Sequence, residues 1–375
     1  MIDIDGKKYE INRKTAIVTN WDKIYCNILK RILKKGELCE NRTGIDTLSI
    51  EGVYFKLDVG KSFPILETKK VALANTITEL LWIYQAQTND VKWLHDRQNH
   101  IWDDWMIDDD GIYRIYEPYI NENKKNIVKV KDIYGNDTNL TASSLKENRT
   151  IKEAIYYGPE YAHTIGTAYG YVVKETKEFD NVLYSLKNNP TSRRNVVSLR
   201  QANLLKTGVL EPCVWASTYK VSNGKLNINV DVRSNDMPIG NPFNVTQYAI
   251  LLSLLAKVSN LEVGNLNWTI SDCHIYVNQL EQIKLQLSRF DKLLKWESFI
   301  KNNDDKEIIK EYKKILESSD IEELMTLKHL ITRENPELYL SNKDNFYEFD
   351  NKKENEDIKV LKYKSLPYIK MPVAQ

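Results

Sequence analysis

A pair of strand-type runs joined by a tight turn constrains the fold of this chain most strongly. The second run, residues 225–233, alternates apolar and polar residues, which is the period-two pattern of a half-buried strand. Asn223-Gly224 precedes it and is a hairpin signal. We expect the hairpin to bring Arg233 back towards Cys213, which opens the first run. A guanidinium beside a thiol lowers the thiol pKa, so this placement would activate the cysteine.

Cys213 admits two interpretations on local evidence. Pro212 fixes its own φ and favours extended backbone before it, so stiff backbone would present the thiol. Free cysteines are nevertheless most often small, buried packing residues. The local pattern leaves open whether Cys213 is a nucleophile or part of the core.

Composition excludes several classes of function. The chain has 375 residues, 42% hydrophobic and 28% charged, which suits a large globular domain. Its net charge of +1 provides no global attraction to nucleic acid or to a membrane surface, so an anion site must be built from local arginines. The four cysteines lack metal-ligand spacing, and we see no signal peptide or membrane-spanning run. We therefore expect a cytoplasmic protein without a metal, a nucleic-acid partner or a membrane partner.

The chain is long enough for one large domain or two ordinary ones, and two stretches interrupt its regular pattern and look like inserts. Residues 106–163 lose clear periodicity and predict a partly ordered surface excursion. Residues from about 291 to 333 are rich in Lys and Glu at helical spacing and predict a second insert. The other predicted elements are a helix from an Asn20 N-cap to Gly36, strands over 47–57, 195–199 and 266–276, and helices over 72–85, 179–187 and 245–258.

Several polar residues in these elements are locally ambiguous. Glu79 lies in a mostly apolar helix, either on its wet face or buried where a raised pKa would suit proton transfer. An arginine in a turn, such as Arg42, is commonly a solvated surface charge. Two adjacent arginines before a strand, Arg193-Arg194, suit a phosphate. Trp102 and Trp105 flank two aspartates and predict either a ligand platform or core packing.

Taken in order, these features resemble thymidylate synthase, the folate-dependent family that methylates dUMP. The resemblance covers the chain from about residue 20 to its end, apart from the two inserts. The matching segments are Asn41–Gly44, Phe63–Lys70, Glu79–Trp82, Thr88-Asn89, Ile101–Trp105, Tyr169-Gly170, Asn189–Arg194, Pro212-Cys213, Arg233–Asp236, Gly240–Asn244, Asp272–Tyr276 and the Pro372–Ala374 tail. It implies a single catalytic domain over residues 1–375 that carries the two inserts. The implied fold is α/β (α+β), with a large mixed sheet, flanking helices, and a sheet face used for dimerisation.

The resemblance also implies a reaction. dUMP would be reductively methylated to dTMP, with 5,10-methylenetetrahydrofolate as the donor of one carbon and hydride, giving dihydrofolate. Cys213 resembles the nucleophile that adds to C6 of uracil, and Arg233 the arginine beside the thiolate and the phosphate. Glu79 resembles the group that moves protons, and Tyr169 a helper in removing the C5 proton through water. Asn244 resembles the residue that reads uracil, because an amide can both donate to O4 and accept from N3–H.

Further binding roles follow from the same resemblance. Arg42 and Ser234 are implied phosphate ligands, and His274 and Tyr276 are implied ligands of the ribose 3′-hydroxyl. Asp236 is expected to contact both substrate and folate. The arginines Arg193 and Arg194 would reach the phosphate of the neighbouring subunit, which implies an obligate homodimer. Folate contacts are expected from Trp102 and from Ala374 in a tail that closes over the cofactor.

Departures from the family pattern leave two other interpretations open. Val214 stands where most members have His, which indicates a minority branch, and Arg200-Gln201 and Gln375 also differ. A related hydroxymethyltransferase would share the nucleophile and folate but let water quench the methylene, and Val214 and Arg200 leave that open. An inactive nucleotide-binding or regulatory homologue is the third interpretation. Asn244 argues against a resemblance to the cytosine-specific relatives, since those enzymes have Asp at this position.

Overall fold

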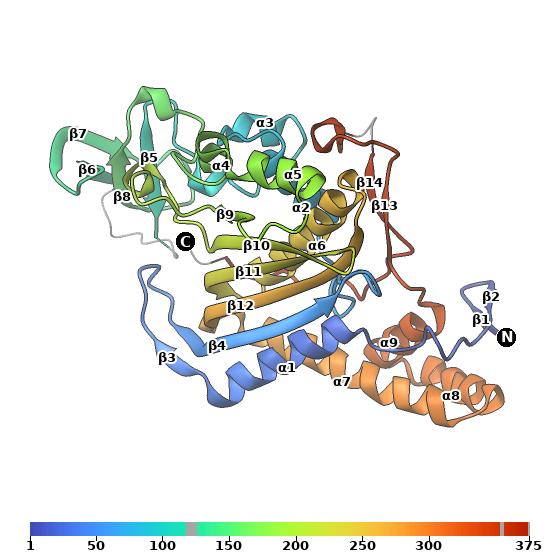
Figure 1. The fold of residues 1–375 in the computed structure, drawn as a ribbon. Helices are drawn as coiled ribbons and strands as arrows, with labels where there is room; N and C mark the ends of the chain where they lie inside the picture. The colour runs from blue at the N-terminus through green and yellow to red at the C-terminus, as the bar shows by residue number, and fades with distance from the viewer. Residues whose placement is uncertain (118–125, 353–355, 374–375) are drawn as a thin grey trace.

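A mixed β-sheet forms the centre of the computed structural model, which describes residues 1–117, 126–352 and 356–373 (Figure 1). In spatial order its six strands are β3 (Glu37–Cys39), β4 (Thr47–Asp58), β12 (Glu262–Tyr276), β11 (Lys225–Asp236), β10 (Val214–Ser222) and β9 (Val196–Ser198). Only β11 and β12 run parallel among these pairs. Their carboxyl ends therefore meet, with Ser234 beside Asp272 and Asp236 beside His274. The large mixed sheet expected from the sequence is confirmed.

The predicted hairpin is present between β10 and β11. Ser222 pairs with Lys225, and the two turn residues between them have φ of 50° at Asn223 and 75° at Gly224. Positive φ at both positions is what a two-residue hairpin turn requires, and Asn and Gly tolerate it best. At the other end of the hairpin the Arg233 amide donates to the Cys213 carbonyl at 2.9 Å.

Helices cover one face of the sheet. The four packed closest to the core are α1 (Asn20–Lys35), α2 (Leu73–Tyr84), α6 (Gly240–Val258) and α7 (Leu280–Asn302). Alternate residues of β4 point towards them, so Val53 and Phe55 are buried while Tyr54 is exposed. The outer face of the sheet is not covered by helices in Figure 1.

Two predicted helix starts are wrong. Thr19 rather than Asn20 caps α1, because its backbone is extended and its hydroxyl accepts the Asp22 amide at 2.9 Å. Helix α6 begins at Gly240 and not after Asn244, since a proline in the first helical turn loses no intrahelical hydrogen bond. The segment 240–244 is therefore the first turn of a helix rather than a loop.

The segment 106–163 is more regular than predicted. It contains a second sheet in the order β5 (Ile112–Tyr116), β8 (Ile151–Tyr156), β6 (Ile127–Asp132) and β7 (Asp137–Ser143), while residues 118–125 lie outside the described part of the chain. Five buried side chains form its core: Ile112, Val130, Ala142, Ile151 and Ala154. So small a core leaves little apolar periodicity in the sequence, which explains the missed strands.

The Lys- and Glu-rich segment is helical, as expected. Helix α7 continues through the boundary predicted near residue 291, and α8 (Asp305–Ser318) and α9 (Ile321–Thr332) follow it. The remaining elements are β1 (Ile2–Ile4), β2 (Lys7–Tyr9), α3 (Val91–His95), η1 (Asp103–Trp105), η2 (Pro159–Tyr161), α4 (Gly170–Thr176), α5 (Glu178–Asn188), η3 (Leu205–Thr207), η4 (Val277–Gln279), β13 (Glu337–Leu340), η5 (Phe346–Glu348) and β14 (Ile358–Leu361). None of the described helices combines the length and apolarity that crossing a bilayer requires.

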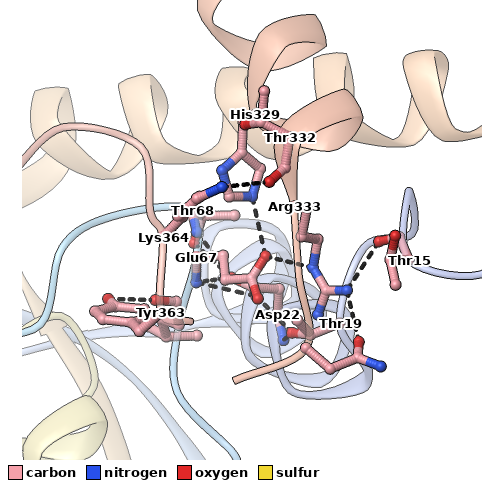
Figure 2. A network of polar contacts seen from close by, with 12 residues as sticks. Thr15, Thr19, Asp22, Glu67, Thr68, His329, Thr332, Arg333, Tyr363 and Lys364 are labelled. Carbon is pink, nitrogen blue, oxygen red and sulfur yellow. Dashed lines mark hydrogen bonds and ion pairs between the residues drawn. The ribbon is translucent and has the colours of Figure 1, made fainter. Parts of the chain in front are cut away.

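A buried polar network joins these helices to the sheet domain (Figure 2). The Glu67 carboxylate accepts from Arg333 Nε at 2.7 Å and lies 2.9 Å from His329 Nε2. The Asp22 carboxylate of α1 accepts the backbone amides of Glu67 and Thr68 at 3.0–3.1 Å. Burial raises the pKa of Asp22, and the nearby Glu67 charge adds to that effect. The network therefore ties Glu67 and Thr68 to α1 on one side and to the end of α9 on the other.

Candidate active site

A cavity of about 170 Å³ lies where α2, α6 and the start of β10 meet. Its lining includes five residues singled out in the sequence: Glu79, Trp102, Tyr169, Cys213 and Asn244. A larger depression of about 650 Å³ lies between residues 59–63 and 335–340, but its lining contains no cysteine and no histidine. The smaller cavity therefore holds the chemically useful groups.

Cys213 is a half-buried residue directly before β10. Burial raises the pKa of its thiol, while the charges of Arg233 and Arg42 act in the opposite direction. The expectation of a lowered thiol pKa is therefore wrong, because desolvation of the thiolate outweighs the charges of both arginines. Arg233 is held instead by two backbone carbonyls, donating from Nε to Pro212 at 3.1 Å and from Nη2 to Glu211 at 2.7 Å.

Glu79 is buried, so the wet-face interpretation is excluded. Trp102 Nε1 donates to its Oε1 at 2.7 Å, and Gln247 Nε2 donates to its Oε2. Burial raises the pKa of Glu79 to about 7, and the two hydrogen bonds limit that rise. A carboxyl group with a pKa near neutrality is well suited to move protons at physiological pH.

Gln247 is a site residue that the sequence reasoning missed. Besides its bond to Glu79, it accepts from Asn244 Nδ2 at 3.2 Å through Oε1. The i, i+3 spacing of Asn244 and Gln247 in α6 could have suggested the pair, because such residues share a helix face. Trp102, Glu79, Gln247 and Asn244 thus form one hydrogen-bonded chain along the cavity wall.

Tyr169 also lines the cavity and has a strained backbone conformation. Its φ is 49°, which is costly for a bulky residue, and Gly170 follows because a Cβ there would collide with the Thr88 carbonyl. The Tyr169 ring packs edge-on against Trp102, with centroids 5.2 Å apart. Burial raises the pKa of Tyr169 far above its ordinary value, and the charges of Cys213 and Glu79 raise it further. Tyr169 is therefore a neutral hydroxyl close to the cysteine.

A second cluster lies at the joined ends of β11 and β12. The Asp272 carboxylate accepts from Ser234 Oγ at 2.7 Å and lies 3.1 Å from His274 Nδ1. Although burial opposes it, these contacts and one from Ser49 hold the pKa of Asp272 well below its usual range. The Tyr276 ring packs edge-on against His274 at 5.2 Å. Asp272 had no role in the sequence interpretation, yet it organises the implied substrate ligands.

Asp236 connects the site to the C-terminal segment. Its carboxylate accepts the Ile239 amide at 3.1 Å and Gln279 Nε2 at 3.3 Å. Gln279 also donates to the Pro372 carbonyl at 3.1 Å, so the tail approaches the cluster. Burial raises the pKa of Asp236. Ala374, the predicted folate contact in this tail, lies outside the described residues.

The arginines differ in their relation to the cavity. Arg42 is exposed, and it influences the pKa values of both Cys213 and Tyr276. Arg193 and Arg194 are exposed before β9 and are not among the residues that line the cavity. Arg42 and Arg233 do not line the cavity either, but the charges of both act on the Cys213 thiol.

Comparisons with known proteins agree on one family. Residues 23–323 match the family model described as "Thymidylate synthase". A thymidylate synthase of Clostridium beijerinckii is 34% identical over 269 residues, which are 72% of this chain and 82% of that protein. One of Mycoplasma mobile is 36% identical over 290 residues, covering 76% and 90%. The solved structure of thermostable thymidylate synthase A from Bacillus subtilis superposes with a TM-score of 0.64 at 28% identity, covering 95% of this chain and 100% of the other.

Proposed function

The chain belongs to the thymidylate synthase family, and we propose that Cys213, Glu79 and Asn244 carry out its methylation of dUMP to dTMP. It is a methyltransferase by this membership. The observation that carries the assignment is one cavity in which a cysteine, a carboxyl group of pKa about 7 and a primary amide all face the same space.

Cys213 is assigned as the nucleophile. Its sulfur forms a bond to C6 of uracil, and the electron pair of the C5–C6 double bond moves towards C5 and O4 as an enolate. The thiolate has to form first, and Arg233 and Arg42 are the charges that favour it. Pro212 and Glu211 position Arg233 through their carbonyls, leaving Nη1 without a partner among the described residues. That nitrogen is available to a phosphate oxygen.

Asn244 and Glu79 are assigned to the base. The Asn244 amide group already donates one hydrogen to Gln247, which leaves its second hydrogen for O4 and its carbonyl for N3–H. Glu79 is placed to exchange protons at the base, and Tyr169 assists in removing the C5 proton through water. The buried chain from Trp102 to Asn244 fixes the orientation of these groups before substrate binds.

The remaining substrate groups are assigned to the second cluster. Arg42, Arg233 and Ser234 would hold the phosphate, and His274 and Tyr276 the ribose hydroxyl. Ser234 donates to Asp272 in this structure, so its backbone amide or a rotated hydroxyl would serve the phosphate. Asp272 keeps His274 in a fixed orientation.

The residues present fit 5,10-methylenetetrahydrofolate as the co-substrate. Trp102 and Tyr169 form an aromatic wall of the cavity, and Asp236 links through Gln279 to the tail at Pro372. Bound folate supplies the one-carbon unit and the hydride. Trp102 would orient it, and the tail would exclude water on closing.

The outer face of the sheet supports a homodimer. A ladder of hydrogen bonds crosses four of its strands, from Tyr54 to Asn267 at 3.2 Å, Asn267 to Asn229 at 2.8 Å and Asn229 to Thr218 at 3.1 Å. Most soluble oligomers are symmetric assemblies of identical chains, and a second copy would cover this face. Arg193 and Arg194 would then reach the partner's phosphate. A monomer that retains full activity in sedimentation at micromolar concentration would contradict this shared site.

Two finer assignments complete the proposal. Val214 is buried and lines the cavity directly after the nucleophile, which supports the minority branch with Val at that position. We also assign the protein to the cytoplasm, because its free cysteines suit a reducing compartment.

The identity of the product tests the function. With dUMP and 5,10-methylenetetrahydrofolate, we expect dTMP and dihydrofolate in equal amounts, because a methyl product needs two electrons from the folate. Hydroxymethyl-dUMP with tetrahydrofolate would establish the hydroxymethyltransferase instead, and bound nucleotide without turnover the inactive homologue. Cys213→Ser, the control, should bind dUMP and lose turnover, and no adduct of wild-type Cys213 with 5-fluoro-dUMP and folate would refute the nucleophile.

A further inference from the structure

Two histidines and an aspartate converge beside the cavity. His95 Nε2 lies 2.6 Å from Asp103 Oδ1, and His100 Nδ1 lies 3.0 Å from Asp103 Oδ2. The two imidazole rings stack with centroids 4.8 Å apart. In the described part of the chain, no other three His, Cys, Asp or Glu side chains bring their ligand atoms within 4.8 Å of one another. The reaction assigned above uses none of these three.

The backbone that carries the histidines is held in place. Helix α3 ends at His95, and Gln98 turns the chain with φ of 57°. Asn99 is 1% exposed, donates from its side chain to the Asn75 carbonyl at 3.2 Å and accepts the Ile101 amide at 3.2 Å. The loop is thus tied to α2, and the separation of the two histidines is set before any ligand arrives.

We propose that His95, His100 and Asp103 form a binding site for a divalent transition metal of the zinc, cobalt or nickel class. Imidazole nitrogen with one carboxylate is a ligand set that such ions accept, whereas calcium and magnesium prefer oxygen. Metal–ligand bonds of about 2.0–2.2 Å place tetrahedral ligand atoms about 3.4 Å apart. The short His–Asp contacts would therefore open by less than about 1 Å around the ion. The two histidine nitrogens, which lie within 4.8 Å of each other, would close by at most about 1.4 Å.

The site is accessible to solvent. The side chains of His95, Asp103 and His100 are 31%, 40% and 63% exposed, which gives an ion an entry path and leaves room for water as a further ligand. Each histidine faces a different oxygen of Asp103, so the carboxylate can bind in either a monodentate or a bidentate manner. No further protein ligand is required.

The site is coupled to the cavity through Trp102. Asp103 follows this residue directly, and Trp102 donates to Glu79 and lines the cavity. A metal on Asp103 would restrain η1 and with it the indole, so occupancy should change the KM for folate. This coupling rests on the proposed function, whereas metal binding itself does not.

Titration of the untagged, chelator-treated chain with Co²⁺ tests the binding. We expect one ion per chain, visible d–d absorption without a thiolate charge-transfer band, and displacement by Zn²⁺. His100→Ala and Asp103→Asn should each weaken binding at least tenfold. His163→Ala is the matched control, because His163 pairs with Asp109 at 2.8 Å without a second histidine, and its affinity should equal that of wild type.

Three results would overturn the site. They are no saturable binding by wild type, equal binding by His100→Ala, or a thiolate band that disappears on replacing the exposed Cys39 or the half-buried Cys213. The coupling has its own readout, the KM for folate with and without Zn²⁺, whose change should vanish in His100→Ala. Metal binding with an unchanged KM for folate would refute the coupling but not the metal site. An inactive chain that still binds Co²⁺ would contradict only the proposed function.

Discussion

Gln247 donates its side-chain amide to Glu79 while its carbonyl accepts from Asn244. This pairing makes the orientation of the Asn244 amide depend on the proton of Glu79. An ionised Glu79 only accepts, so Gln247 must turn its NH₂ group towards it and its carbonyl towards Asn244. Protonated Glu79 can donate from Oε2 to the Gln247 carbonyl. The side-chain amides of Gln247 and Asn244 would then both turn over, so that Gln247 donates to Asn244. The ionised form leaves the Asn244 carbonyl free for N3–H of uracil.

Gln247→Leu should separate the reading of the base from the binding of the phosphate. Without Gln247, Asn244 loses its orientation and Glu79 loses a hydrogen bond worth about 1.5–3 kcal/mol in its charged form. We expect kcat/KM for dUMP to fall about tenfold to a hundredfold. The Kd for inorganic phosphate should not change. Gln247→Glu is the matched variant of similar size. An unchanged kcat/KM in both variants would show that Gln247 does not couple the proton of Glu79 to the orientation of Asn244.

The pH dependence of catalysis should report Glu79. Its pKa is raised to about 7, so it is ionised above that pH and protonated below it. Because the ionised form orients Asn244 for uracil, kcat/KM for dUMP should fall as the pH decreases through about 7. This fall is the acidic limb of the pH profile. Glu79→Gln should lose the limb, and its rate should fall roughly 10²–10⁴-fold. Trp102→Phe keeps the carboxyl group but removes a donor, so its limb should move to higher pH.

A Glu79→Gln variant that retains the limb would show that another group titrates. The pair of half-buried His163 and exposed Asp109 offers a check, because His163→Ala should leave the profile unchanged.

How far the sequence predicts this structure depends on whether the cause is local. The turn at Asn223-Gly224 is local chemistry, and it was predicted correctly. The burial of Glu79 was undecidable, because every residue of α2 from Thr76 to Tyr84 is buried and no polar face marks the side that meets the cavity. The direction of the Cys213 pKa was wrong because sequence reveals a neighbouring arginine but not the depth of burial.

Other features required contacts between distant parts of the chain. Strand β5 pairs with its neighbour β8, although these are the first and last strands of the second sheet in sequence, so the pairing has no local cause. Glu67 meets its partners His329 and Arg333 from more than 260 positions away in the sequence. Neither arrangement could be read from spacing.

The Glu67 network should be a major source of stability. Glu67 and Arg333 side chains are 3% and 2% exposed, and Glu67 Oε1 has no hydrogen-bond partner in the described residues. Arg333→Met would leave a buried carboxylate without its cation, which typically costs about 3–5 kcal/mol. Urea unfolding should show this loss, and the double variant Arg333→Met, Glu67→Gln should recover part of it. Lys362→Met, which breaks an exposed pair with Glu337, should cost less than about 1 kcal/mol.

Equal losses from the buried and the exposed pair would contradict the network. A loss in the double variant that equals the sum of the single losses would show that Glu67 and Arg333 act independently.

Asn244→Asp should change the choice of base. Uracil presents an acceptor at O4 and a donor at N3, which the amide matches, whereas cytosine presents a donor at N4 and an acceptor at N3. An ionised aspartate would face O4 acceptor to acceptor, and an unpaired buried polar group costs about 1–3 kcal/mol. That is about a tenfold to more than a hundredfold loss in preference for dUMP. Some turnover of dCMP should appear, because a carboxylate accepts from N4 and its protonated form donates to N3.

The hydrogen bonds from Asn244 through Gln247 to Glu79, called the relay from here on, add a second consequence for this variant. Gln247 would then lie between two carboxyl groups, that of Glu79 and the one introduced by Asn244→Asp, but could donate to both only by giving up its acceptor role. One of the two carboxyl groups should therefore remain protonated near neutral pH, and the limb assigned to Glu79 should move to higher pH. The measurement is kcat/KM for dUMP and dCMP against pH in both proteins, with inorganic phosphate binding as the control. An unchanged ratio of the two substrates would show that Asn244 does not read the base, whereas a changed ratio with an unmoved limb would place Gln247 outside the relay.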